Sequence, residues 1–177
     1  MISVCMATYN GEQFLKEQID SILQQLNEHD ELIISDDNST DTTQDIIRSY
    51  NDFRIKLVQN SLQRGVTHNF ENALCHSKGN IIFLADQDDF WLPNKIKELT
   101  QFLSKGDYDI VTCNCALTDA NLNITQERYY IDKSPIDKSA LENYVNNLWL
   151  GCCMAFKREL LLATLPFPEK VVAHDLW

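Results

Sequence analysis

Residues 81–93, IIFLADQDDFWLP, decide the fold that this sequence predicts. Four apolar residues, 81–84, lead into carboxylates at Asp86, Asp88 and Asp89. An unbroken apolar run of this length is typical of a strand that is buried on both faces, as the strands of parallel sheets are. Parallel α/β sheets bind their ligands just beyond the carboxyl ends of the strands. The three carboxylates therefore follow the strand at the place where such a protein is expected to bind its ligand.

The carboxylates after this strand predict a site for a divalent cation. Two carboxylates about 5 Å apart repel each other by roughly 3 kcal/mol at an effective dielectric constant near 20, and a bound cation removes that repulsion. Hard oxygen ligands suit Mg²⁺ or Mn²⁺. The alternative is a solvated acidic turn that caps the next helix. Asp89 is expected to begin that helix rather than to bind the ion, and Trp91 either packs beneath the site or contacts its ligand.

Length and charge limit the possible functions. The chain has 177 residues, enough for one domain with a sizeable core. Its formal net charge of −11 argues against nucleic acid as a main partner, because phosphate backbones are bound by clustered basic residues. Nucleotides are not excluded, since a metal ion can meet their phosphates. The sequence has no apolar run as long as a membrane span, and residues 2–9 resemble a strand more than a signal peptide.

The chain has six cysteines, Cys5, Cys75, Cys113, Cys115, Cys152 and Cys153. None of them forms a C-x-x-C pair, and most lie within apolar runs, where a free cysteine behaves as a small hydrophobic residue. We therefore expect reduced, structural thiols in a cytoplasmic protein, not a zinc site. The adjacent Cys152 and Cys153 are expected to be packing residues rather than nucleophiles.

Four strand–helix units follow one another from the amino terminus. The predicted strands cover residues 2–9, 31–35, 55–59 and 81–84, and the predicted helices cover 12–26, the segment around 46–50, the segment from 70 to a glycine stop at Gly79, and 93–103. This alternation predicts an α/β fold with a Rossmann-like, mostly parallel sheet flanked by helices. A further strand is predicted at 109–117.

The alternation weakens beyond this strand. Residues 119–138 are polar and are expected to form a loop or a lid, whereas 148–156 return to the core. A helix is predicted at 158–165, and an exposed connector at 166–170. The chain ends on a hydrophobic residue, which suggests a fragment of a longer protein.

Polar residues follow three of the predicted strands. Thr8-Tyr9-Asn10 follow the first strand, the pair Asp36-Asp37 follows the second, and the carboxylates already described follow the fourth. If these strands are neighbours, one cleft holds an aromatic ring for a base and carboxylates for base, ribose and metal, a set that suits a nucleoside diphosphate. The chain has only five glycines and neither a G-x-G-x-x-G nor a Walker motif. A cation and basic residues such as Arg64 are then expected to neutralise the phosphates.

Three motifs in order carry a resemblance to a known family. ISVCMATYNGEQFL, ELIISDDNSTDTT and IIFLADQDDFWLPNKI resemble the nucleotide-binding half of the inverting family-two glycosyltransferases, which have the GT-A fold. ADQDDFW and the closing HDLW are most similar to bacterial rhamnosyltransferase-like members that build surface polysaccharides. The resemblance covers essentially the whole chain. It implies a nucleotide-sugar (donor) subdomain over residues 1–118 and the start of an acceptor-side subdomain, truncated, over 119–177.

The resemblance implies roles for residues at the donor pocket. The residues expected to bind the nucleotide sugar are Thr8, Tyr9 and Asn10 at the base and ribose, Asp37 with Asp36 beside it at the base, Arg64 at the phosphates and Asp86 at the ribose or metal. Two alternatives stay open from the residues themselves. Tyr9 can be a core aromatic residue at a strand end, and one of the two acids at 36 and 37 can cap the following helix.

The resemblance also implies the metal ligands and the catalytic base. Asp88 is expected to bind Mn²⁺ or Mg²⁺ directly, with Asp86 as the second ligand, and Asp175 falls where the family places the base that takes the acceptor hydroxyl proton. The family more often has a Glu-Asp pair at the base, whereas this chain has His174-Asp175. Family members also continue well beyond this point, so donor binding is expected to survive better than transfer.

The leading hypothesis is a metal-dependent inverting glycosyltransferase. It would move a sugar from a UDP- or dTDP-linked donor to a saccharide or lipid-linked acceptor in surface polysaccharide synthesis, in the cytoplasm or at the inner face of the membrane. Peripheral membrane association through missing residues is part of this hypothesis. A nucleotidyltransferase that makes an activated sugar is one alternative, although such enzymes need a glycine-rich basic loop where this chain has TYNGEQF. A non-catalytic nucleotide-sugar binding module is the other.

Overall fold

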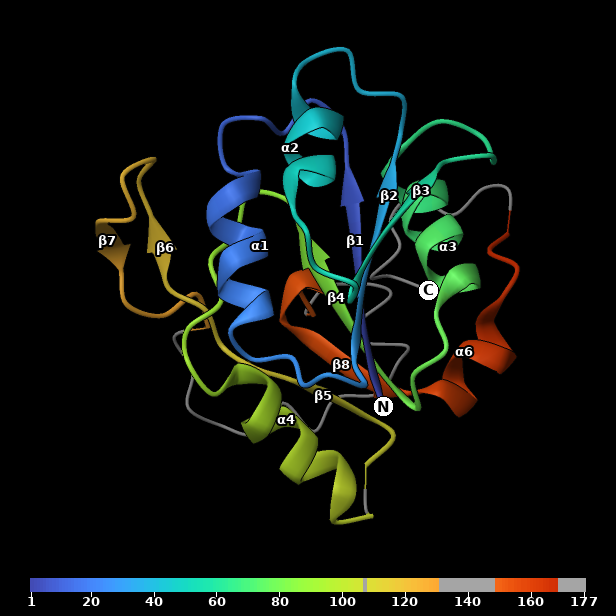
Figure 1. Cartoon of the computed structure of the whole chain (residues 1–177). Helices are drawn as coiled ribbons and strands as arrows, with labels where there is room; N and C mark the ends of the chain where they lie inside the picture. The colour runs from blue at the N-terminus through green and yellow to red at the C-terminus, as the bar shows by residue number, and fades with distance from the viewer. Residues whose placement is uncertain (107, 131–148, 169–177) are drawn as a thin grey trace.

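A six-stranded sheet forms the centre of the fold in this computed structural model, which describes residues 1–106, 108–130 and 149–168. Its strands lie in the order β3 (Ile55–Gln59), β2 (Glu31–Asp36), β1 (Ile2–Thr8), β4 (Ile81–Asp86), β8 (Met154–Lys157) and β5 (Ile110–Thr112) (Figure 1). Strands β3, β2, β1 and β4 are mutually parallel, whereas β8 runs antiparallel to β4 and β5. The predicted α/β fold with a mostly parallel sheet is confirmed.

Helices cover both faces of this sheet. The described helices are α1 (Leu15–Leu23), α2 (Thr43–Ser49), α3 (Val66–His76), α4 (Lys95–Ser104) and α6 (Arg158–Thr164). One core joins the sheet to α1, α2 and α4, and the other joins it to α3 and α6 (Figure 1). Successive residues of a strand point to opposite faces, so in β1 Val4 and Met6 enter the first core while Cys5 and Ala7 enter the second. This double burial explains the unbroken apolar runs of the sequence.

The end of α3 differs from the prediction. The helix ends at His76, with Ser77 as its C-cap, and Gly79 is not the helix stop that the sequence suggested. A Cβ atom built on Gly79 would lie 2.4 Å from the backbone nitrogen of Ser3 and 2.7 Å from the carbonyl carbon of Ile2. Glycine is therefore needed here because the chain that enters β4 passes against the backbone of β1.

Two further predictions, for residues 109–117 and 119–138, are corrected. The strand expected at 109–117 is much shorter, because β5 ends at Thr112. In the sheet, β8 lies between β5 and β4. The loop or lid expected at 119–138 contains strand β7 (Ile124–Gln126), which forms a hairpin with β6 (Leu117–Thr118) away from the main sheet (Figure 1). Residues 131–138 lie outside the described part.

The segment expected to return to the core does so in its described part. It contains the 3₁₀ turn η1 (Gly151–Cys153) and strand β8, in which Met154, Ala155 and Phe156 are buried. The helix predicted at 158–165 is α6. Strand β8 belongs to the same sheet as β4, so the subdomain boundary near residue 118 stays a prediction. The connector predicted at 166–170 is described only to residue 168.

Glu31 joins several elements at the amino-terminal end of the sheet. Its carboxylate accepts hydrogen bonds from Ser3 Oγ at 2.5 Å and from the Lys78 backbone N–H at 2.7 Å, and it pairs with Lys56 on β3. Burial opposes the charged form, but these hydrogen bonds outweigh it and hold the pKa of Glu31 below its usual range. The network ties β1, β2, β3 and the start of β4 together at the end of the sheet where β1 begins.

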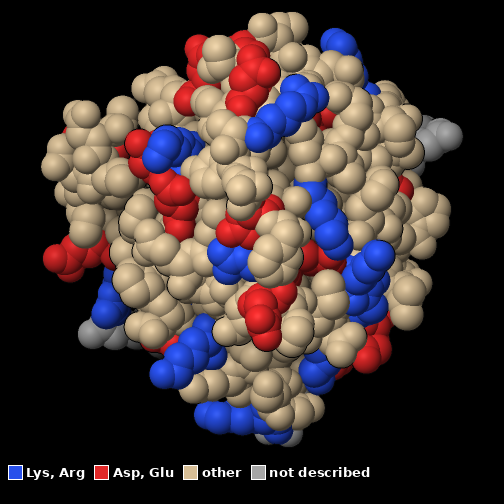
Figure 2. All heavy atoms as spheres, viewed as in Figure 1, with Lys and Arg blue, Asp and Glu red and all other residues tan. Residues whose placement is uncertain are grey.

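The surface charge and the character of the helices are relevant to possible binding partners. On the face drawn in Figure 2, Lys and Arg side chains are interspersed with Asp and Glu side chains. Among the described residues, no helix combines the length and the apolar character needed to cross a membrane.

Candidate functional site

A cleft of about 510 Å³ opens at the carboxyl ends of β1 and β4. Its walls come from the end of β1, the residue after β2, the loop before α3 with the first turn of that helix, and the turn after β4. The lining residues are Ala7, Thr8, Tyr9, Asp37, Arg64, Gly65, Val66, Asn69, Asp86, Gln87 and Asp88. The structure thus brings together residues that the sequence placed in one site from three separate strand ends.

The side chain of Gln87, which follows β4, holds the backbone of Tyr9 beside the cleft. Its side chain is 52% exposed, so it is not the core aromatic residue that the sequence left open. The Gln87 amide holds the backbone of Tyr9 from both sides: Oε1 accepts from the N–H at 2.9 Å and Nε2 donates to the carbonyl at 3.1 Å. A Cβ atom on Gly11 would lie 2.3 Å from Gln87 Oε1, so the glycine of the Asn10-Gly11 turn makes room for this clamp.

Asp37 fixes the loop that carries Arg64. The carboxylate is 7% exposed and accepts hydrogen bonds from Asn60 Nδ2 at 2.8 Å and from the Gly65 backbone N–H at 2.9 Å. Gly65 has φ of +121°, a conformation that suits glycine and turns the loop into α3. Asp37 therefore lines the cleft itself and also positions the segment that brings a guanidinium to it.

Asp36 and Asn10 do not line the cleft. Asp36 is fully buried, and its carboxylate accepts from the Ser39 N–H at 2.9 Å, from Ser39 Oγ at 2.5 Å and from Gln44 Nε2 at 2.7 Å. Asn10 has φ of 48°, and its side-chain oxygen accepts from the Thr40 N–H at 2.8 Å. Of the two adjacent acids, Asp36 thus shapes the turn before α2, while Asp37 faces the cleft.

Asn69 offers the cleft a buried hydrogen-bond acceptor. Its side chain is 2% exposed, and Nδ2 donates to the Thr8 carbonyl at 3.0 Å. Its Oδ1 has no hydrogen-bond partner in the described part of the chain. A buried oxygen of this kind is costly unless it is hydrogen-bonded.

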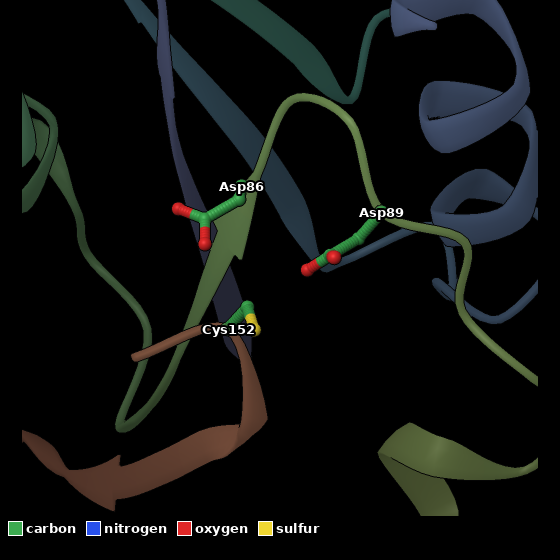
Figure 3. A group of neighbouring side chains, drawn as sticks. All are labelled: Asp86, Asp89 and Cys152. Carbon is green, nitrogen blue, oxygen red and sulfur yellow. The ribbon is translucent and has the colours of Figure 1, made fainter. Parts of the chain in front are cut away.

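Asp86, Asp89 and Cys152 form a group that can hold a metal ion. One ligand atom from each lies within 4.8 Å of the others, and Figure 3 shows the three side chains near one another, on β4, the following turn and η1. The prediction that Asp89 begins a helix is wrong, since α4 begins at Lys95 after Asn94 as N-cap. At 4.8 Å two carboxylates repel by about 3 kcal/mol at an effective dielectric constant near 20.

The groups around Asp89 shift the pKa of its carboxyl group in opposite directions. Burial raises the pKa of Asp89, and the charge of Asp88 adds to this, whereas a hydrogen bond with Cys152 and the Lys95 ammonium oppose it. Lys95 Nζ donates to the Cys152 carbonyl at 2.6 Å and lies 4.1 Å from the centre of the Trp91 ring. Trp91 is 2% exposed and packs against Phe83, with the ring centres 5.7 Å apart.

Further thiols lie beside this group. The Cys113 backbone N–H donates to the Cys153 carbonyl at 3.0 Å, which continues the β5–β8 pairing by one residue. A hydrogen bond with the Cys153 thiol lowers the pKa of Cys113 to about 7. The thiol groups of all six cysteines are free.

The comparison with protein families decides the assignment of the chain. The sequence model described as glycosyl transferase family 2 matches residues 3–163. This chain belongs to glycosyltransferase family 2. Its parallel sheet with the cleft at the strand ends is the GT-A fold of that family.

Relatives and solved structures agree with this assignment. The chain is 27% identical over 168 residues to the Escherichia coli UDP-Glc:α-D-GlcNAc-diphosphoundecaprenol β-1,3-glucosyltransferase WfgD, covering 95% of this chain and 64% of that protein. S. aureus TarS 1–349 in complex with UDP matches with a TM-score of 0.76 at 21% identity, over 99% of this chain and 52% of TarS. The Pyrobaculum calidifontis mannosyltransferase PcManGT, in complex with GDP-Man and Mn²⁺, matches with a TM-score of 0.72 at 24% identity, over 99% and 49%. The chain thus spans less than two thirds of each.

The sequence analysis does not single out some residues that line or support the cleft. Gln87 and Asn69 act through backbone contacts and burial that no local pattern reveals. The sequence analysis notes Asp89 but predicts that it begins a helix, and it predicts that Cys152 is a packing residue. The predicted base Asp175, with His174, lies outside the described residues and beyond the segment matched by the family model, so its role stays a prediction.

The donor set suits a divalent cation. Asp86 and Asp89 supply carboxylate oxygens and Cys152 supplies a sulfur, all partly buried. Asp88, the predicted direct ligand, is exposed and lines the same cleft, but it is not part of this three-residue group. The carboxylates of the turn after β4 therefore offer more than one way to hold an ion beside the cleft.

Proposed function

We propose that this chain is the donor-binding part of a metal-dependent, inverting glycosyltransferase. It would transfer a sugar from a nucleoside diphosphate sugar to a saccharide or lipid-linked acceptor in the synthesis of a surface polysaccharide. The observation that carries this proposal is the single cleft that unites Tyr9, Asp37, Arg64 and the carboxylates after β4 in a chain of glycosyltransferase family 2. The rhamnosyltransferase-like branch remains a proposal within this function.

Each wall of the cleft suits one part of the donor. The half-exposed Tyr9 ring offers a stacking surface for the base, and the Asp37 carboxylate offers an acceptor for N–H and hydroxyl groups. Arg64 is the basic residue of the lining and is placed to meet the phosphates. The relative WfgD is named for a UDP-linked glucose donor, which favours UDP over dTDP for this chain.

The carboxylates at the turn after β4 would hold Mn²⁺ or Mg²⁺, with Asp88 and Asp86 as the predicted ligands. The bound cation would neutralise charge on the departing diphosphate. Asp86, at the end of β4, and the exposed Asp88 both line the cleft, which supports this proposal.

We further propose that Asp175 is the catalytic base. Its carboxylate would take the proton of an acceptor hydroxyl while that oxygen forms a bond with the anomeric carbon and the bond from this carbon to the diphosphate breaks. Attack from the side opposite the leaving group inverts the anomeric configuration. The relative WfgD is named for an acceptor that carries a lipid diphosphate, which supports a lipid-linked acceptor here.

Calorimetric titration of UDP, dTDP and GDP, each with Mn²⁺ and again with a chelator, tests the donor half. We expect UDP to bind in a metal-dependent way and Asp88→Ala to lose that binding. Asp45→Ala is the matched control, because its side chain is 85% exposed on α2. Failure of all three diphosphates to bind, both to this chain and to a longer form of the protein, would refute the proposal.

A further inference from the structure

A second groove lies between α1 and α4, with a volume of about 620 Å³. One wall comes from the end of α1 and the turn after it, and the other from the segment after β4 and from α4 (Figure 1). Ile2, the first residue of β1, also lines this groove, whereas Ala7 and Thr8 near the other end of β1 line the cleft. The two share no lining residue, so a ligand in one does not need to displace a ligand in the other.

Hydrogen bonds join the two walls of the groove. Gln25 Nε2 donates to the Leu92 carbonyl at 3.3 Å, and Gln25 Oε1 accepts from the Ile96 backbone N–H at 3.2 Å. Ser21 Oγ accepts from the Trp91 backbone N–H at 3.0 Å. These bonds connect the end of α1 to the segment that leads into α4. The groove therefore has its shape without a ligand, as small-molecule sites usually do.

Three carboxamide side chains of the groove are free to bind a ligand. Gln24, Asn94 and Gln101 line it, are exposed, and make no side-chain hydrogen bond with the described residues. Asn94 is the N-cap of α4, a position at which asparagine commonly caps the helix, yet its side chain makes no capping bond. Each carboxamide offers two donors and an acceptor. The groove thus suits a ligand that both donates and accepts hydrogen bonds.

Two further residues of the groove carry buried polar atoms without a partner. Trp91 Nε1 and Thr100 Oγ1 are buried and have no hydrogen bond in the described part of the chain, in which Asn69 Oδ1 is the third such atom. Both residues line the groove. Since buried polar atoms are usually hydrogen-bonded, such atoms are uncommon. Unmet hydrogen-bonding capacity in the described chain is therefore concentrated among the residues of this groove.

The charge of the groove favours a neutral ligand. No Asp or Glu of the described chain lines it, although the sequence has 26 of them, and Lys97 is its charged residue. A divalent cation would lack carboxylate ligands there, and a nucleoside diphosphate would lack both a metal site and clustered basic groups. Phe90, also in the lining, is 46% exposed and offers an apolar ring. Sugars combine hydroxyl groups, which donate and accept, with C–H faces that pack on aromatic rings.

We propose that the groove between α1 and α4 binds a neutral saccharide, with Gln24, Asn94 and Gln101 at its hydroxyl groups and Phe90 against a sugar face. This is a site in addition to the cleft, and it goes beyond the proposed function. Strand β1, which has seven residues and rises about 3.3 Å per residue, separates the two by about 20 Å. The saccharide is therefore held apart from the donor sugar.

The test is a titration of the isotope-labelled chain, without nucleotide, followed by NMR of its backbone and side-chain amides. The probes are maltotriose, cellotriose, laminaritriose and chitotriose, each up to about 20 mM, which detects dissociation constants in the millimolar range. We expect at least one of them to shift the side-chain amide signals of Gln24, Asn94 and Gln101 along one binding curve. The backbone signals of Tyr9 and Gly65, which line the cleft, should stay in place.

Two variants remove single amides while preserving the fold. Gln101→Ala changes an exposed helix position, and Asn94→Gly keeps a residue that tolerates the φ of 71°. Each should weaken trisaccharide binding by about 3- to 10-fold, the effect of one hydrogen bond. Gln13→Ala and Asn51→Gly are the matched controls, because both side chains are exposed and lie outside the groove and the cleft, and they should bind as the wild type does.

Three results would overturn the proposal. The first is that none of the four trisaccharides shifts the signals of the groove. The second is that inorganic phosphate shifts them while the trisaccharides do not, which would show an anion site at Lys97. The third is that Gln101→Ala and Asn94→Gly both bind with wild-type affinity. UDP binding should be the same in these variants as in the wild type, so failure here is distinguishable from failure of the proposed function.

Discussion

Replacing Asp37 by asparagine should release the loop that carries Arg64 and weaken nucleotide binding. The two carboxylate oxygens accept from Asn60 Nδ2 at 2.8 Å and from the Gly65 N–H at 2.9 Å. An amide has one oxygen, so one of these donors would face an NH₂ group. A hydrogen bond to a charged group contributes about 1.5–3 kcal/mol. If the ligand must then order the loop, UDP affinity falls by about 10- to 150-fold.

Calorimetry of UDP binding, with amide hydrogen exchange at Gly65, measures both parts of this effect. Asp45→Asn is the matched control, because the same chemical change at a side chain that is 85% exposed should alter stability by less than about 0.5 kcal/mol and leave binding unchanged. The reasoning is refuted if Asp37→Asn binds UDP within about twofold of the wild type while the Gly65 amide exchanges no faster.

Three further substitutions test the framework around the cleft. Glu31→Gln should lower the free energy of unfolding by about 1.5–3 kcal/mol at pH 7. Because the pKa of Glu31 in the folded protein lies below its usual value, this difference should be full above that usual value and disappear as the pH falls through the folded pKa. Urea unfolding that shows a pH-independent difference would contradict this. Gly79→Ala should cost about 1–3 kcal/mol, because the added methyl group meets backbone at 2.4 Å, and an unchanged melting temperature would argue against that contact. Gly11→Ala should displace the Gln87 amide, because the added Cβ would lie 2.3 Å from it, and should reduce UDP affinity with little loss of stability. A large loss of stability with unchanged UDP affinity would show that the hydrogen bonds from Gln87 to Tyr9 serve only the fold.

The sequence predicts the central strands well because their burial leaves a direct mark. Strands β1, β2 and β4 are largely buried on both faces by helix layers, so most of their central positions are apolar and polar residues follow at the strand ends. The helices opposite them carry one apolar stripe, as in α1, where Ile19 and Ile22 are buried. Both patterns lie within short stretches of sequence, so they can be recognised without knowing which distant residues pack against them.

The errors arise where the outcome depends on distant contacts. Hydrophobic pattern does not say which strand pairs with which, so the place of β8 between β4 and β5 could not be predicted. Asp36 and Asp37 are chemically identical neighbours, and only their alternation across the strand end separates the buried one from the one that lines the cleft. Cys152 approaches Asp89 only because β8 returns to the sheet beside β4.

The measurement that tests the central claim most directly is a crystal structure of the chain with UDP and Mn²⁺, with the ion located by its anomalous scattering. The account predicts the uracil ring at Tyr9 and Asp37, the diphosphate towards Arg64, and the anomalous peak beside the carboxylates that follow β4. A nucleotide bound elsewhere, such as in the groove of about 620 Å³ that Trp91 and Lys97 help to line, would contradict it.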